Sequence, residues 1–426
     1  MATLESIHYV PHRAEVCENS VSWVKTRKKM IEELPQIMWA DNQPWREANL
    51  WALTRASDQK RSLKTIWSAM KHIHAYAKWL EDEAVAWWHF PEREADRCLV
   101  RYRGALVDSI KNGEIAPSTA QQRMACAIRF YRWLAASRLL SPEWPMWQER
   151  MIGIHLHDSF GFDRTIVTKT TDLAIPNRKA IGEKLEDGLL PIASKNVAEI
   201  LNFADENASQ ELALMLRLGF GTGMRFGTIA DLKVKTIQNA VPDPWFSGYF
   251  LLAVGPGAHP AVHTKFGVTG QIWISIDDLQ ILRNYMFSAR RLKRQTQADT
   301  KHIGHVFLTR FSKPFGSEGS DSSRAINVEL GRLRKAALAK GVTAFHNFHF
   351  HQSRCTFATE LARVAIRHGS VGTAIELVMR ALLHKHEGTS LKYIKFVEKT
   401  KIMSEMSDEF TRRFLGLTSS RLAESN

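Results

Sequence analysis

The chain has 426 residues and an ordinary 44% hydrophobic content, so two or three packed domains are expected. Its formal net charge of +14 favours a polyanionic partner modestly over mere solubility. The four cysteines lack paired spacing and no apolar run is long enough for a membrane span, which argues against a disulfide framework, a cysteine zinc site and a membrane protein. We therefore expect a soluble protein of a reducing cytoplasm.

Residues 1–55 form a tryptophan-rich extension that contains Trp23, Trp39, Trp45 and Trp51. A helix is predicted to begin near Trp45, after Asp-Asn and Pro residues that are typical of a helix start. Packing in a core is the favoured role of these side chains, and base stacking is the less favoured alternative.

Residues 56–145 have the periodicity of three helices. The first stripe is Ile66, Met70, Ile73, Ala77 and Leu80, the second helix runs from about Glu92 to Asn112, and the third begins at Pro117. The third helix carries Arg123, Arg129 and Arg132. We weigh contact with DNA phosphates and an ordinary solvated face as equally good interpretations of these arginines.

Residues 146–189 are predicted to be a linker, because Pro, Gly and mixed charge occur from about residue 141 to 190 without a period. His155, His157 and Asp158 suggest a metal, but without further matched ligands chance is the favoured explanation.

From Leu190 onward the pattern mixes helices and strands. Helices are predicted over 195–206, 209–220, 277–295 and 323–340, and strands over 249–254 and 271–276. Ile272, Ile274 and Ile276 alternate in the second strand. No glycine-rich phosphate loop is found, so nothing implies the use of ATP.

Four residues near the C-terminus form a set suited to phosphate chemistry: His351, Arg354, His384 and Tyr393. His351 and Arg354 are three residues apart and share one helical face. Arginine binds two phosphate oxygens through its planar fork, histidine moves protons near neutral pH, and tyrosine can act as a covalent nucleophile.

This region resembles the catalytic core of the tyrosine recombinases, the phage-integrase family. The resemblance rests on His-x-x-Arg in HQSR, on ALLH, and on the nine residues from His384 to Tyr393. An upstream Thr-Gly-Met-Arg supplies the family's first arginine as Arg225, and a predicted hairpin supplies its lysine as Lys265.

Three positions depart from the family pattern. Leu383 stands where the family usually has Gly, and Cys355 where it usually has His. Thr228 replaces the usual acidic residue after the first arginine, so another group must orient Arg225, and Asp231 is one suggestion. The spacer between Arg354 and His384 is also longer than usual.

The resemblance implies a fold that is mainly α with a small β-sheet in the catalytic domain. It places a helical, SAM-like core-binding domain at 56–145 and a mixed α+β catalytic domain at 190–415, followed by a tail at 416–426. The tail helix before residue 416 would carry Met403, Met406, Phe410 and Phe414, either packed on its own domain or docked on a neighbouring protomer.

The implied activity is site-specific cutting and rejoining of duplex DNA through a 3′-phosphotyrosine, in the integration or excision of a mobile element. Tyr393 would be the nucleophile, Arg225 and Arg354 would stabilise the transition state, and Lys265 would protonate the leaving oxygen. His351 would act as acid and base near Tyr393, and His384 would bind a phosphate oxygen. No metal or cofactor is implied.

The implied partners are double-stranded DNA, three further copies of the chain in a tetramer, and possible accessory DNA-bending or directionality factors. A cytoplasmic protein associated with a prokaryotic nucleoid would fit. The alternatives are a type IB topoisomerase, which uses nearly the same residues, and a non-catalytic DNA-binding or regulatory protein.

Overall fold

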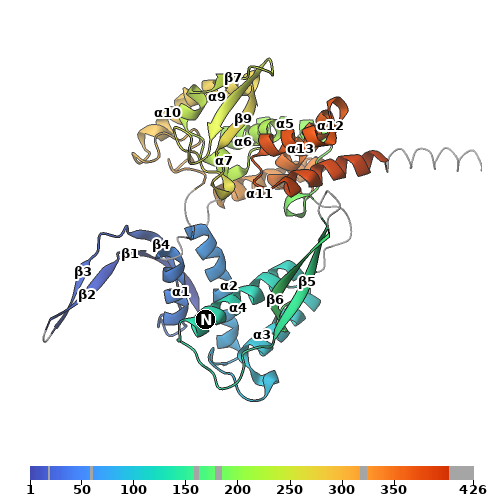
Figure 1. Ribbon diagram of the computed structural model, residues 1–426. Coiled ribbons are helices and arrows are strands. Elements are labelled where there is room, and N and C mark those ends of the chain that lie inside the picture. The colour runs from blue at the N-terminus through green and yellow to red at the C-terminus, as the bar shows by residue number, and fades with distance from the viewer. Residues whose placement is uncertain (18–19, 58–60, 158–162, 178–184, 317–323, 403–426) are drawn as a thin grey trace, which may run out of the picture. The chain divides into compact units, whose positions relative to one another are not determined.

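The computed structural model describes all residues except 18–19, 58–60, 158–162, 178–184, 317–323 and 403–426 (Figure 1). The chain divides into two compact units, an N-terminal unit built mainly from residues 1–180 and a C-terminal unit built mainly from 181–426. Both units are mainly helical with small antiparallel sheets, which confirms the expected fold class. Among the described residues, no helix is long and apolar enough to cross a membrane.

The core of the N-terminal unit is helical, as predicted. Its elements are β1 (Thr3–Tyr9), β2 (His12–Cys17), β3 (Ser20–Lys25), β4 (Ile31–Met38), α1 (Arg46–Ser57), α2 (Leu63–Asp82), η1 (Glu94–Asp96), α3 (Cys98–Lys111), α4 (Pro117–Ala136), β5 (Glu149–His157) and β6 (Asp163–Thr171). The whole predicted stripe of α2 is buried. The hydroxyls of Tyr76 and Tyr131 lie 2.8 Å apart and join α2 to α4 inside this core.

The strands of this unit were not predicted. β1 pairs with β4 and β2 with β3, both antiparallel, so that residues 3–38 form an arm that extends from the helices in Figure 1. At its base, Asn49 of α1 bonds the backbone N–H and carbonyl of Ile37, at 2.7 and 3.1 Å. The irregular structure predicted around residues 141–190 is also wrong in part, because β5 and β6 pair over nine residues each. Their alternation was hidden by interspersed Gly, Asp and Thr.

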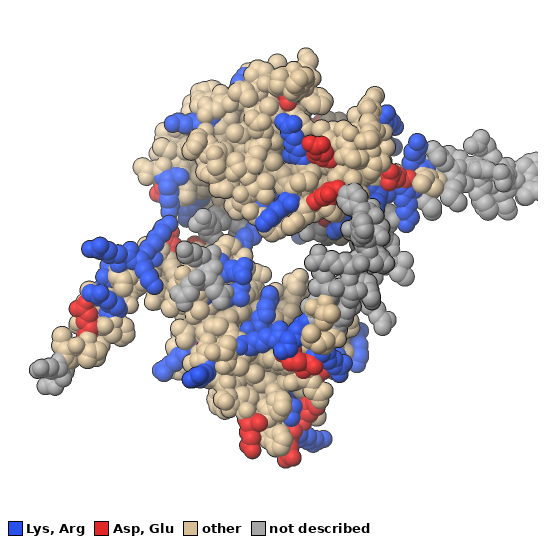
Figure 2. Space-filling view, viewed as in Figure 1, with Lys and Arg blue, Asp and Glu red and all other residues tan. Residues whose placement is uncertain are grey.

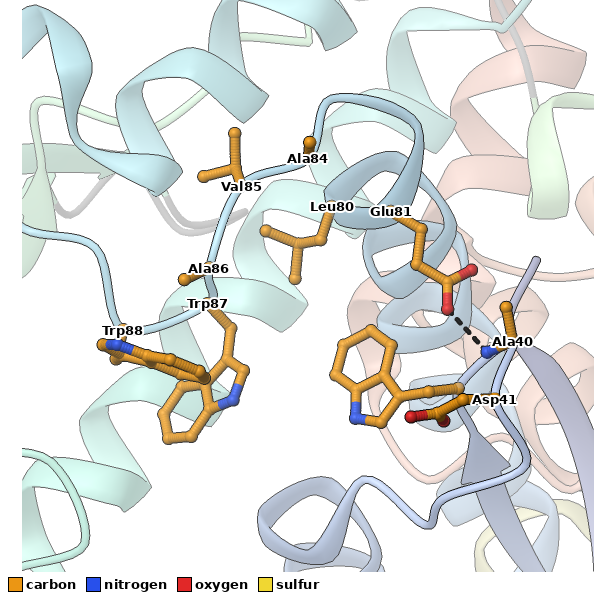
Figure 3. A pocket seen from close by; sticks show the side chains of 10 residues that line it. Ala40, Asp41, Leu80, Glu81, Ala84, Val85, Ala86, Trp87 and Trp88 are labelled. Carbon is orange, nitrogen blue, oxygen red and sulfur yellow. Dashed lines mark hydrogen bonds between the residues drawn. The ribbon is translucent and has the colours of Figure 1, made fainter.

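The tryptophans differ in burial. Trp45 and Trp51 are buried with the helices, which confirms packing there. Trp23 on β3 is 70% exposed, so packing is wrong for that residue. Trp39, Trp87 and Trp88 line an open pocket beside the end of α2 (Figure 3).

The C-terminal unit holds the proposed chemistry. Its elements are η2 (Glu186–Gly188), α5 (Ser194–Asn207), α6 (Gln210–Thr222), α7 (Phe226–Ala230), α8 (Val234–Gln238), β7 (Val241–Pro242), β8 (Tyr249–Val254), η3 (Lys265–Gly267), β9 (Gly270–Ser275), α9 (Ile276–Met286), α10 (Ala289–Thr296), α11 (Arg324–Ala339), η4 (Thr343–Phe345), α12 (His351–His368) and α13 (Val371–Leu382), with a further helix over 387–402. α12 packs against both α6 and α13. That packing brings three separate stretches of sequence together.

Two predictions for this unit need correction. The helix predicted over 277–295 is two helices, because Ser288 caps α10 by accepting from the N–H of Arg291. The second strand ends at Ser275, and Ile276 begins α9 and is 52% exposed, so Ile276 does not continue the buried alternation. β8 and β9 otherwise pair as expected, with Leu252 opposite Ile272 and Phe250 opposite Ile274.

Candidate active site

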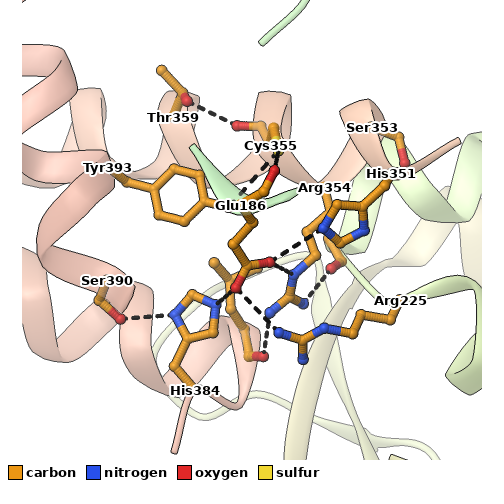
Figure 4. A network of polar contacts seen from close by, with 12 residues as sticks. Glu186, Arg225, His351, Ser353, Arg354, Cys355, Thr359, His384, Ser390 and Tyr393 are labelled. Atoms are coloured by element: carbon orange, nitrogen blue, oxygen red, sulfur yellow. Dashed lines mark hydrogen bonds and ion pairs between the residues drawn. The ribbon is translucent and has the colours of Figure 1, made fainter. Parts of the chain in front are cut away.

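The site is centred on Glu186, a residue that the sequence analysis placed in the linker. Its carboxylate points into the space between Arg225, His351, Arg354 and His384 (Figure 4). Oε1 lies 3.2 Å from a terminal nitrogen of Arg225 and 3.0 Å from Nε2 of His384. Oε2 lies 3.1 Å from Nε of Arg354 and 3.3 Å from Nε2 of His351. Two cations and two imidazoles thus meet on a single carboxylate.

Electrostatics keep Glu186 ionised. Burial by itself raises the pKa of this carboxyl, but the contacts with His351 and His384 and the charges of Arg354 and Arg225 outweigh it and hold the pKa far below its usual range. The pocket therefore favours a negative charge, and in this structure the carboxylate of Glu186 fills it.

Arg354 is fixed by the ends of two helices. It lies on α12, and its two terminal nitrogens donate to the carbonyls of Gly223 at 2.8 Å and Leu382 at 2.9 Å. Gly223 ends α6 with φ of +66°, a left-handed conformation that favours glycine. The chain can thus turn immediately before Arg225, which caps the start of α7.

Arg225 contacts Glu186 and not Asp231. Its terminal nitrogen donates to Oε1 of Glu186 at 3.2 Å. Asp231 instead bonds Nζ of Lys233 at 2.5 Å, Nε2 of His305 at 3.1 Å and the N–H of His263 at 2.7 Å. The suggestion that Asp231 orients Arg225 is therefore wrong, because one of its oxygens contacts Lys233 and His305 and the other contacts the N–H of His263.

His384 is held by a second partner that the sequence analysis missed. Its Nδ1 lies 2.9 Å from the hydroxyl of Ser390, and both side chains are buried. Burial is the main cause that lowers the pKa of His384, so the neutral imidazole predominates near pH 7. A neutral ring can donate from Nε2 to Glu186 and accept at Nδ1 from Ser390.

Leu383 precedes His384, at the position where a glycine was expected from the family pattern. It ends α13 in the left-handed conformation, with φ of +51°. Its side chain packs on Gly270 of β9, where an added Cβ would collide with it. That packing offsets the strain of a branched residue in this conformation.

Tyr393 lies in the same cluster but is inaccessible. It is on the helix over 387–402, its side chain is 0% exposed, and its ring stacks beside His384 with centroids 6.1 Å apart. Its hydroxyl approaches the Sγ of Cys355 at 3.9 Å. Burial first, then Cys355 and Glu186, raise the pKa of Tyr393 far above its ordinary value. Deprotonation therefore needs a base and a changed environment.

Lys265 lies apart from the other candidates. It is in the predicted hairpin, in the short turn η3 between β8 and β9, and it is exposed. Its Nζ is 5.4 Å from the centre of the Phe266 ring. Within the part of the chain that the structure describes, no hydrogen bond or ion pair joins Lys265 to the other five predicted residues. Its role stays a prediction.

The three arginines of α4 differ in their surroundings. Arg129 is exposed, and Arg123 is half-buried. Arg132 donates to both oxygens of Glu149 at 3.0 and 3.2 Å. Lys and Arg side chains gather over the region of α2 and α4 on the face drawn in Figure 2. Contact with DNA stays a prediction for all three.

Sequence reasoning missed Glu186, Ser390 and the part played by Cys355. One signal existed, because Thr228 stands where an acidic residue was expected, which raised the question of which carboxylate contacts Arg225. Nothing in the local sequence LEDG identified which carboxylate it was. The apolar stripe over 403–414 lies outside the described residues.

No protein-family model matches the sequence, and no curated protein matches it. Solved structures similar to this chain include integrases and a recombinase. The Tn1549 transposon integrase (residues 82–397) in complex with circular intermediate DNA is 13% identical, with a TM-score of 0.48 over 82% of this chain and 94% of that chain. A lambda integrase dimer bound to a COC′ core site is 15% identical, with a TM-score of 0.46 over 82% and 76%. The XerA recombinase is 14% identical, with a TM-score of 0.32 over 82% and 92%. Because identities and TM-scores are this low, the chemistry inferred below rests on the site itself.

Proposed function

We propose that this chain is a site-specific DNA recombinase that cuts and rejoins duplex DNA through a 3′-phosphotyrosine. The observation that carries the proposal is the convergence of Arg225, His351, Arg354 and His384 on the two oxygens of one anion, beside Tyr393. A DNA phosphodiester also presents two charged, non-bridging oxygens. The resemblance of the motifs to the tyrosine recombinases supports the same function.

The proposed reaction needs no external energy. The Tyr393 oxygen attacks phosphorus while the bond to the 5′-oxygen breaks, and Lys265 gives that oxygen its proton. His351 takes the phenolic proton. The phosphoryl group stays on Tyr393 until another 5′-hydroxyl attacks it, so the strand is rejoined with the bond energy conserved. Arg225 and Arg354 stabilise the charge that develops on the non-bridging oxygens, because they remain protonated throughout.

The proposed partners follow from this chemistry. Exchange between two duplexes breaks four strands, so four protomers on DNA are expected. Integration or excision of a mobile element is the role that we propose, and accessory DNA-bending factors fit it.

The test is a covalent adduct. Duplexes that the protein selects from a random-sequence pool are nicked near the bound site and incubated with the protein, and adduct is detected after denaturation. Wild-type protein should form adduct, and Tyr393→Phe should bind DNA without forming any. Adduct at the wild-type level in Tyr393→Phe would show that Tyr393 is not the nucleophile.

A second assay separates the recombinase from its alternatives. The wild-type protein is given two duplexes that carry the selected site, and joined products are measured. Relaxation of supercoils without any joining would indicate a type IB topoisomerase, and binding without adduct would indicate a regulatory protein.

A further inference from the structure

Glu186 has the contacts that a DNA phosphate would need. Each of its two oxygens faces one arginine and one imidazole nitrogen, at 3.0 to 3.3 Å. An ionised carboxylate and an ionised phosphodiester both present two oxygens that share one negative charge, and both accept several N–H donors. Nε of Arg225 is buried and makes no hydrogen bond to any described residue, so the pocket holds a donor that the carboxylate does not use.

The segment around Glu186, residues 185–190, also covers Tyr393, the proposed nucleophile. Leu185 is 6% exposed and belongs to the same buried apolar cluster as Cys355 and Tyr393, and Leu189 packs against that cluster. Tyr393 cannot reach a DNA phosphate while it is fully buried. The residues that fill the anion pocket therefore also help to close the site.

This segment is attached to the site at one end. The carbonyl of Leu190 accepts from Nε2 of Gln352 at 3.2 Å, and the N–H of Ile192 donates to Oγ1 of Thr356 at 2.9 Å. Both partners are on α12, beside Arg354. The C-terminal side of the segment is therefore tied to α12.

We propose that Glu186 is a built-in stand-in for the scissile phosphate, and that residues 185–190 keep the site closed until DNA displaces them. This inference rests on the proposed function and adds its regulation. Two anions cannot share one set of donors, so Glu186 must leave the pocket when a phosphate enters it. A change of this kind withdraws the carboxylate and uncovers Tyr393 together.

A second role for Glu186, orienting Arg225, predicts the opposite effect of its loss on activity. If Glu186 replaces the acidic partner that Thr228 does not supply, it stays beside Arg225 during the reaction and its loss lowers activity. If Glu186 occupies the phosphate position, its loss opens the site and raises both anion affinity and the rate of adduct formation. One substitution distinguishes the two roles by sign.

The first experiment needs no DNA target. Binding of inorganic phosphate is measured by calorimetry for wild-type protein, Glu186→Gln and the charge-matched control Glu206→Gln, whose carboxylate is exposed on α5. A site that is closed nine-tenths of the time binds about tenfold more weakly than an open one. We expect Glu186→Gln to bind phosphate at least about tenfold more tightly than wild type, and Glu206→Gln to match wild type. Equal or weaker binding by Glu186→Gln would overturn the inference.

The second experiment measures the rate of adduct formation on the nicked selected duplex in a single turnover. Glu186→Gln should form adduct faster than wild type and Glu206→Gln, in a Tyr393-dependent way. Slower adduct formation would assign Glu186 the orienting role and overturn the inference. If neither protein forms adduct although Glu186→Gln binds phosphate more tightly, the proposed function fails while the stand-in role holds.

A third measurement uses the wild-type protein and does not depend on how the variant folds. The N–H of Leu189 donates to the carbonyl of Glu186 at 3.2 Å, and that of Gly188 to the carbonyl of Leu185 at 3.2 Å. Saturating phosphate or bound duplex should speed hydrogen exchange at both amides. Unchanged exchange at saturation would show that the segment does not leave the site.

Discussion

At the scale of single residues, Glu186 and Ser390 together favour one tautomer of His384, because the ionised carboxylate near Nε2 can only accept, whereas the hydroxyl near Nδ1 can donate. A neutral His384 that donates to an anion from Nε2 needs a donor at Nδ1, and Ser390 lies there at 2.9 Å. Ser390→Ala leaves a buried acceptor without a partner, at a cost of about 1–3 kcal/mol. We expect a shifted tautomer in the ¹⁵N spectrum of His384 and a lower adduct rate at unchanged DNA affinity. An unchanged spectrum would contradict this role.

The lowered pKa of His384 predicts how the stability of the fold changes with pH. In the unfolded chain this histidine titrates near its ordinary pKa of about 6.5, and in the folded chain below it. Below about pH 6.5 the unfolded state binds a proton that the folded state does not, so acid reduces stability. Urea unfolding at pH 7.5 and 5.5 should show a smaller acid loss for His384→Asn than for wild type. An equal loss in both proteins would assign the pH dependence to other groups.

Arg354 has a structural role in addition to the catalytic role that we propose for it. Lysine keeps the charge but has all its donors on one nitrogen, so it lacks the planar fork by which Arg354 reaches the carbonyls of Gly223 and Leu382 with two separate nitrogens. We expect Arg354→Lys to lower the adduct rate by about 10²–10³, the loss typical of one transition-state donor, and to lower the melting temperature as well. DNA affinity should change little. An affinity loss as large as the rate loss would indicate a structural role alone.

At the scale of elements, the end of α6 places Arg225. Gly223 has φ of +66°, and an added Cβ there would meet the side chains of Phe357 and Leu382. Gly341, in the same unit, has φ of +78° with nothing within 4 Å, so alanine there adds only the backbone strain of about 1–2 kcal/mol. Gly223→Ala should therefore destabilise the protein more than Gly341→Ala in urea unfolding, and it alone should lower phosphate affinity. Equal losses would show that the contact with α12 and α13 is tolerated.

At the scale of the whole molecule, the charge of +14 predicts binding to DNA that depends strongly on salt. Each phosphate that the protein neutralises releases counterions, so affinity should fall steeply between ~50 and ~200 mM salt. Arg129→Ala should weaken binding to all sequences and reduce the salt slope by about 1. Arg132→Ala should have a smaller effect, because Arg132 is already paired with Glu149. A flat salt response would contradict an interface dominated by phosphates.

The sequence by itself determined the helices and the order of the chemical groups. Apolar spacing is a local property, so the helices α2, α3 and α4 and the pairing of β8 with β9 could be predicted, although α3 begins at Cys98 and not near Glu92. The arm over residues 3–38 and the β5–β6 pair were not predicted, because they are largely exposed or polar and do not alternate regularly between apolar and polar residues. Local propensity is a weak guide for such strands.

Only the tertiary structure decided what occupies the site. Glu186 lies 39 residues from Arg225 and 168 from Arg354 in the sequence, and no local pattern joins them. The packing of α12 on α6 and α13 brings the arginines and histidines together, and their combined positive potential then draws in the carboxylate that fits. The fold decides which acidic residue contacts the arginines, because electrostatic attraction depends on distance in space and not on separation along the sequence.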